Sequence, residues 1–149
     1  MKTLDYYRSL PDVMSSTEVA AEFAEILSDP DCAHISHDTV AVLSELSERQ
    51  WNTYTLLGNH VRGEVERLLE KFWRDDDADL AEVLFGVAGR LGVASFLSFV
   101  SLRGVARMSA AVQFVVVECV AELQETIADP YSGLQDDFPG ACVKDDERL

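Results

Sequence analysis

The sequence predicts a single all-α domain, built either as a helical bundle or as a short stack of about six helices in antiparallel pairs. Apolar side chains recur every three to four residues through most of the chain, which is the period of a helix. The 149 residues include only four prolines and eight glycines, and 48% are apolar, which is enough for one hydrophobic core. We expect residues 1–149 to form one domain, with a lead-in segment over 1–14 and a loop and acidic tail over 131–149.

The first helix is predicted from its amino-terminal cap. Ser15 and Glu18 have the spacing of a capping box, in which each side chain accepts a hydrogen bond from the backbone of the other residue. Asp29-Pro30-Asp31 should end this helix, because the residue before a proline avoids the α conformation. The apolar positions between these signals lie on one helical face: Val19, Phe23, Ile26 and Leu27.

A second apolar stripe runs from about residue 38 to residue 73, which is long enough for one helix or two. Ser36 or Asp38 can cap its start. Runs longer than about 25 residues are unusual in a compact domain, so we expect a break, either near Ser47 or at the turn-prone pair Gly58-Asn59. Glu45 and Glu48 are predicted to face water, and the predicted buried positions are Val40, Leu43, Leu46, Tyr54, Leu57, Val61, Val65, Leu68 and Phe72.

The second half of the chain predicts three more helices. The acidic segment Asp75–Asp79 should begin a helix that ends at Gly92, since carboxylates suit a helix start and glycine suits a helix end. A shorter apolar helix over 94–102 follows. Residues 105–128 contain neither Gly nor Pro and predict a long final helix, although their β-branched residues would also suit a strand of exceptional length. Because residues 110–117 are apolar nearly all round, we expect this helix to be central.

The stretch from Asp79 to Pro130 resembles HEAT or armadillo-like repeats. It contains a helix with Leu and Val on one face, a Leu-Gly turn, a short apolar helix and a long helix opened by Arg107. The resemblance covers about a third of the chain and implies stacked helix pairs.

The chain is strongly acidic, with 27 Asp and Glu against 12 Lys and Arg and a formal charge of -15. A field of this sign repels phosphates and anionic headgroups, so we expect basic partners rather than nucleic acid or a membrane surface. Glu82 and Arg90 interrupt the apolar run over 80–102, which disfavours a membrane span. The polar start of the chain and three widely separated cysteines suit a reducing cytoplasm.

Three polar clusters match metal sites only in part. Cys32–His37 offers too few paired ligands for zinc. The acidic segment over 75–79 matches the first positions of a calcium-binding loop, but the glycine and glutamate required further on are missing. Glu118, Glu122 and Glu125 share one side of the last helix without the Glu-x-x-His pair of a di-iron bundle. We expect no metal and no cofactor.

Motifs for catalysis are equally incomplete. Gly86-x-x-Gly89-x-x-Gly92 lies within a helix rather than after a strand, so it indicates close helix packing instead of nucleotide binding. Ser, His and Asp occur without the sharp turn that carries a nucleophile. We therefore expect a binding protein rather than an enzyme. Trp51 and Tyr54, one helical turn apart among polar residues, suit a protein interface, with core packing as the alternative.

In size, charge and helical make-up, the chain resembles the immunity proteins that protect bacteria from polymorphic or contact-delivered toxins. This resemblance implies a non-enzymatic domain that acts as a monomer or homodimer and blocks the basic active-site cleft of a cognate toxin, such as a nuclease. The predicted partner contacts are Asp75, Asp76, Asp77, Glu118, Glu122, Glu125, Trp51 and Tyr54.

Two alternatives remain open. A helical-repeat adaptor or self-assembling subunit would be favoured by a large apolar surface around Phe96, Phe99 and Phe114. An enzyme with an unrecognised helical site would be favoured by a pocket that holds His34, His37 or Glu118.

Overall fold

The computed structural model describes residues 1–34 and 36–131, and these residues contain α-helices and 3-10 turns without strands, which confirms the predicted all-α class. There are seven α-helices in this part of the chain, one more than the approximate number expected. In order, the elements are α1 (Leu4–Arg8), α2 (Ser16–Leu27), the 3-10 turn η1 (Pro30–Ala33), α3 (His37–Trp51), α4 (Asn59–Phe72), α5 (Ala78–Leu91), α6 (Ala94–Arg103), the 3-10 turn η2 (Val105–Arg107) and α7 (Ala110–Leu123). Apart from Tyr131, the predicted tail over 131–149 lies outside the described residues.

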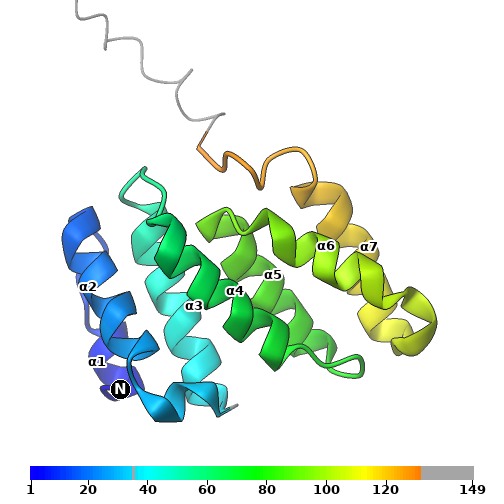
Figure 1. The fold of residues 1–149 in the computed structure, drawn as a ribbon, viewed down its shortest axis with the longest axis horizontal. Helices are drawn as coiled ribbons and strands as arrows, with labels where there is room; N and C mark the ends of the chain where they lie inside the picture. The colour runs from blue at the N-terminus through cyan, green and yellow to red at the C-terminus, as the bar shows by residue number, and fades with distance from the viewer. Residues whose placement is uncertain (35, 132–149) are drawn as a thin grey trace, which may run out of the picture.

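The helices stack in two layers (Figure 1). One layer contains α1, α3, α5 and α7, each in contact with the next, and the other contains α2, α4 and α6. Contacts between α2 and α3, α4 and α5, and α5 and α6 join the layers. This arrangement buries one face of each helix against its neighbours, as in proteins built from stacked helix pairs. The core between the layers includes Phe23, Leu43, Leu69, Leu84 and Phe96.

Local signals set the helix ends in the first half of the chain as predicted. The capping box at α2 is present: the Glu18 amide donates to Ser15 Oγ over 3.2 Å, and the Ser15 amide donates to a Glu18 carboxylate oxygen over 2.9 Å. The long stripe is broken between Trp51 and Asn59, at the Gly58-Asn59 alternative. Ser47, the other candidate break, is buried within α3.

A buried arginine attaches the amino-terminal lead-in to α3. Arg49 is only 5% exposed, and its guanidinium donates to the Glu45 carboxylate and to the carbonyl oxygens of Arg8 and Leu10, the latter two over 3.4 and 3.2 Å. Tyr7 of α1 is fully buried in the same region. Glu45 was expected to face water, but it is half-buried because it neutralises this guanidinium.

The apolar run over 80–102 folds as two helices joined by a tight turn. Asp77 caps α5 by accepting a hydrogen bond from the Leu80 amide over 3.0 Å, and Gly92 ends the helix in the left-handed conformation, at φ +69°. The start of α5 in the acidic segment and its end at Gly92 both agree with the prediction. No helix within residues 1–34 and 36–131 is long and apolar enough to cross a membrane.

The last helix differs from the prediction in where it begins and where it lies. Residues Val105–Arg107 form a separate 3-10 turn, and α7 begins only after Ser109, whose hydroxyl accepts from the Val112 amide over 3.3 Å. The helix ends at Leu123 rather than near residue 128. It is also not central, because it is the last helix of its layer and the side that faces away from α5 has no covering helix among the described residues (Figure 1). The central position belongs to α5.

Substitution of two glycines tests whether the turn after α5 requires the left-handed conformation of Gly92. We expect Gly92→Ala to lower the free energy of unfolding by roughly 1–2 kcal/mol, because the left-handed conformation strains residues that carry a Cβ atom. The new atom would also lie 3.2 Å from the carbonyl oxygen of Ile127. The matched control is Gly63→Ala in the interior of α4, where no atom would lie within 4 Å; it should raise stability by roughly 0.5–1 kcal/mol. Urea denaturation measures both, and equal effects would contradict the assigned turn.

Candidate functional site

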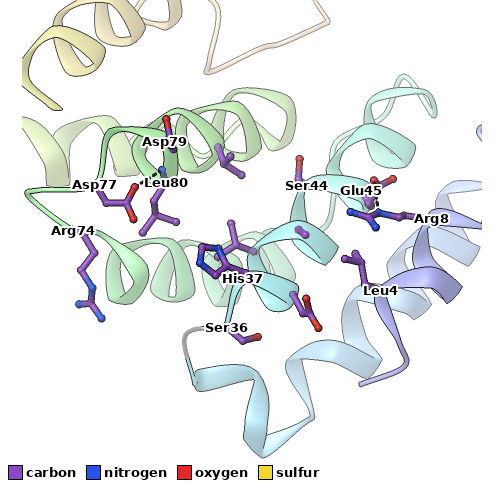
Figure 2. Close-up of a pocket in the computed structure, with 14 residues that line it drawn as sticks. Leu4, Arg8, Ser36, His37, Ser44, Glu45, Arg74, Asp77, Asp79 and Leu80 are labelled. Atoms are coloured by element: carbon purple, nitrogen blue, oxygen red, sulfur yellow. Dashed lines mark hydrogen bonds and ion pairs between the residues drawn. The ribbon is translucent and has the colours of Figure 1, made fainter. Parts of the chain in front are cut away.

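The layer of α1, α3, α5 and α7 carries two grooves, one on each side of α5. The first, which we call the N-terminal groove, has a volume of about 760 Å³ and lies between α1, α3 and the start of α5. Figure 2 shows Leu4 and Arg8 on one wall, with Asp77 and Leu80 on the opposite wall and His37 between them. The second, the C-terminal groove, has a volume of about 540 Å³ and is lined mainly by α5 and α7, with Trp51 of α3 at one side.

The N-terminal groove is predominantly acidic. Four carboxylates line it, against two arginines, Arg8 and Arg74. Arg8 lies 3.9 Å from the Glu45 carboxylate. Its side chain is nevertheless exposed and keeps most of its contact with water. The four acidic residues are Asp38, Glu45, Asp77 and Asp79. The same groove holds apolar side chains, among them Leu80 and the half-exposed Val83, so it offers both charge and hydrophobic contact.

The C-terminal groove depends on a close approach of α5 and α7. A Cβ atom at Gly89 would lie 2.9 Å from a methyl carbon of Leu123, so the absence of a side chain lets the two helices pack closely. This agrees with the packing role predicted for the glycine motif. Arg90 of α5 also lines this groove, where its guanidinium donates to the Ser47 hydroxyl over 3.3 Å and lies 3.6 Å from the Glu48 carboxylate.

Carboxylates gather around Cys119 in this groove. Burial raises the pKa of the Cys119 thiol, and the negative charges of Glu122, Glu82 and Glu118 raise it further. The thiol is therefore protonated near neutral pH and is a poor nucleophile. Without a reactive thiol, the groove offers a negatively charged rim above a half-buried apolar floor. Such a surface suits recognition of a positively charged group.

An aromatic cluster forms around Trp51, beside the C-terminal groove. The Tyr131 ring lies 5.1 Å from Trp51 and 6.3 Å from Tyr54, measured between ring centroids. The Tyr131 hydroxyl donates to the Gln50 carbonyl over 3.1 Å. Trp51 is half-buried and Tyr54 is largely exposed. No sequence pattern marks Tyr131, because its partners lie about 80 residues earlier in the chain.

The predicted acidic contacts are divided between these grooves. Asp77 lines the N-terminal groove while it caps α5, whereas Glu122 lines the C-terminal groove with Trp51. Asp76 is exposed in the turn before α5, and Glu118 and Glu125 are exposed at the carboxyl end of the α7 region. The structure therefore places Trp51 and Glu122 in the groove on one side of α5 and Asp77 in the groove on the other.

Asp75 faces inward and joins three elements. It accepts a hydrogen bond from the indole N–H of Trp73 over 2.8 Å and two from the Arg103 guanidinium, over 3.1 and 2.9 Å. Its backbone carbonyl also accepts from the Ser109 amide over 2.8 Å. The Arg103 and Trp73 hydrogen bonds lower the pKa of this carboxyl group. These contacts show that Asp75 links α4, α6 and α7.

The cluster considered for metal binding is dispersed. Cys32 is buried, whereas His34 and His37 are exposed, and His37 lines the N-terminal groove. In the part of the chain that the structure describes, no three His, Cys, Asp or Glu side chains are placed to share a metal ion. Comparisons with protein families, with curated proteins and with solved structures find no match to this chain.

Asp75 should give stability a defined pH dependence. Because its pKa is lowered in the folded protein, its contribution is present above the unfolded pKa, near 3.9, and is lost as the pH falls through the folded value. We expect Asp75→Asn to reduce the free energy of unfolding by roughly 1.5 kcal/mol at pH 7, and the deficit to shrink below about pH 4. The exposed neighbour provides the control, since Asp76→Asn should change little. Tryptophan fluorescence during urea denaturation reports both, and a deficit that stays constant with pH would contradict the assignment.

Proposed function

We propose that this chain is a non-enzymatic protein-binding domain that uses the outer side of α5, with the grooves on either side, to bind a basic partner. One observation carries the proposal: both grooves combine apolar walls with an excess of carboxylates on a continuous helical face. Between the grooves, α5 presents the exposed side chains of Asp79, Glu82 and Val83. Solenoid-like proteins use such faces as extended binding surfaces.

The charge and the apolar groups have different roles in this proposal. Carboxylates at the rim accelerate the encounter with a positive surface, and their effect weakens as salt screens it. Aromatic and aliphatic groups at the centre of an interface supply most of the affinity once they are desolvated. Val83 lines the N-terminal groove and Trp51 lines the C-terminal groove, so both can supply such apolar contacts.

Within this class, we propose an immunity protein that neutralises a bacterial toxin. A nuclease cleft must be basic in order to hold phosphates, so an acidic ridge with flanking grooves is a suitable plug for it. Binding by occlusion requires no reactive group on the inhibitor.

A helical-repeat adaptor is the second candidate, and it is favoured by the stacked architecture and by the exposed Phe114 on the last helix of the layer. Of the three phenylalanines predicted to surround an apolar surface, Phe96 is buried and Phe99 is half-buried, stacked on Phe96. Phe114 is the one that remains exposed. The adaptor hypothesis predicts a partner that is not toxic to the cell.

Co-expression provides the direct test of the immunity proposal. The product of the gene adjacent to this one should arrest growth when it is expressed alone, and this chain should restore growth and co-purify with that product at low salt. An upstream neighbour that is harmless, together with no co-purification at low salt, would overturn the proposal.

Charge variants identify the surface used in that complex. We expect Glu82→Gln combined with Glu122→Gln to lower the association rate constant roughly tenfold at low salt, with a much smaller effect at high salt. The matched control removes two charges from the other layer, by Glu64→Gln with Glu66→Gln in α4, and should have little effect. Stopped-flow binding measures both pairs. Equal slowing by the control pair would show that total charge, not this face, governs association.

A further inference from the structure

The outer side of α7 carries an apolar stripe that none of the described residues covers. Phe114 and Val117 are each 64% exposed. With two exposed alanines they follow a spacing of four, three and four residues, which places all of them on one helical face. We call this set the α7 stripe: Ala110, Phe114, Val117 and Ala121. None of its members lines either groove, so the α7 stripe is separate from the proposed partner-binding face.

We propose that the α7 stripe binds the same stripe on a second copy of this chain, in an antiparallel arrangement about a two-fold axis. The stripe is self-complementary in this direction. When the axis passes between Phe114 and Val117, the large phenylalanine of one copy meets the smaller valine of the other, and Ala110 meets Ala121. Such reciprocal contacts are what a two-fold interface requires.

The charges beside the stripe favour the antiparallel direction. Glu118 and Glu122 are exposed in the carboxyl-terminal half of α7, whereas Arg107 is exposed just before the helix begins. An antiparallel pair brings the arginine end of one copy to the glutamate end of the other. A parallel pair would instead place the two glutamate ends together and would also align the helix dipoles unfavourably.

The described part of the chain that follows α7 runs away from the stripe. After α7 the chain turns back toward α3 (Figure 1). There Tyr131 packs on Trp51, and its hydroxyl donates to the Gln50 carbonyl. The last described residue therefore lies against α3, on the side of α7 opposite to the stripe.

Interface size and net charge set the strength of this dimer. A 14-residue helix is about 21 Å long, so a contact of one helix with one helix is small and its dimer should be weak and concentration-dependent. Each copy carries a formal charge of -15, so the copies repel at low salt. Salt should therefore strengthen self-association, whereas it should weaken binding to a basic partner.

Sedimentation equilibrium over a range of protein and salt concentrations tests the proposal. We expect the wild-type chain to dimerise with rising concentration, and Val117→Glu to remain monomeric at concentrations at least tenfold higher. The matched control is Val13→Glu, at a valine that is 81% exposed near the opposite end of the stack, and it should dimerise like the wild type. Circular dichroism verifies that both variants fold.

The outcomes separate this proposal from the proposed function. A wild-type chain that is monomeric throughout, or equal dimerisation by Val117→Glu, would overturn the self-association. Loss of toxin co-purification on Val117→Glu, without any dimer, would overturn it as well and would assign the α7 stripe to that partner. Normal dimerisation without toxin rescue would leave the α7 stripe intact and remove the immunity proposal alone.

Disulfide trapping tests the direction of the helices. In a Cys119→Ala, Cys142→Ser background, an equimolar mixture of Ala110→Cys and Ala121→Cys chains should form cross-linked dimers under oxidation. Either variant alone should not form them, because in an antiparallel dimer the introduced cysteines of the two copies would lie about 16 Å apart along the helix axis. Efficient cross-linking of Ala110→Cys alone would overturn the antiparallel arrangement.

Discussion

The packing of α5 against four other helices is the constraint on which the structure depends. It contacts α3 and α7 within its own layer and α4 and α6 in the other. Gly89 permits the close approach of Leu123, and Gly92 ends the helix where the chain must turn back into the second layer. Burial of one side of α5 leaves its opposite side exposed between two grooves. The same packing therefore creates both the core and the candidate binding face.

Charged side chains have two different roles in this acidic chain. Arg49 and Asp75 act internally, since the first holds the amino-terminal lead-in on α3 and the second joins Trp73 to Arg103. The hydrogen bonds of Arg49 offset part of the cost of burying its charge, whereas the Asp75 side chain is half-buried and keeps contact with water. The glutamates on α5 and α7 are exposed and keep their hydration. Net charge alone does not distinguish these roles.

Two surfaces of opposite physical character follow from the stack. The face around α5 carries an excess of carboxylates, whereas the α7 stripe is apolar and lies where the described part of the stack ends. Because ionic attraction weakens with salt and repulsion between like-charged copies is also screened, the two proposed associations respond to salt in opposite ways. The two proposals thus assign a basic partner to one face and a second copy to another.

The sequence by itself determined the features that depend on neighbouring residues: the all-α class, the cap at Ser15, the acidic start of α5 and its end at Gly92. It left the break in the long stripe open between Ser47 and Gly58-Asn59, and the structure decided for the second. The sequence also marked Trp51 and Glu122, although not their meeting in one groove. The tertiary structure alone decided that α7 is terminal rather than central, that Asp75 faces inward, and that Tyr131 completes the aromatic cluster. The reason is that helical periodicity reports which residues share a face, whereas burial depends on helices from distant parts of the chain that cover that face or leave it open.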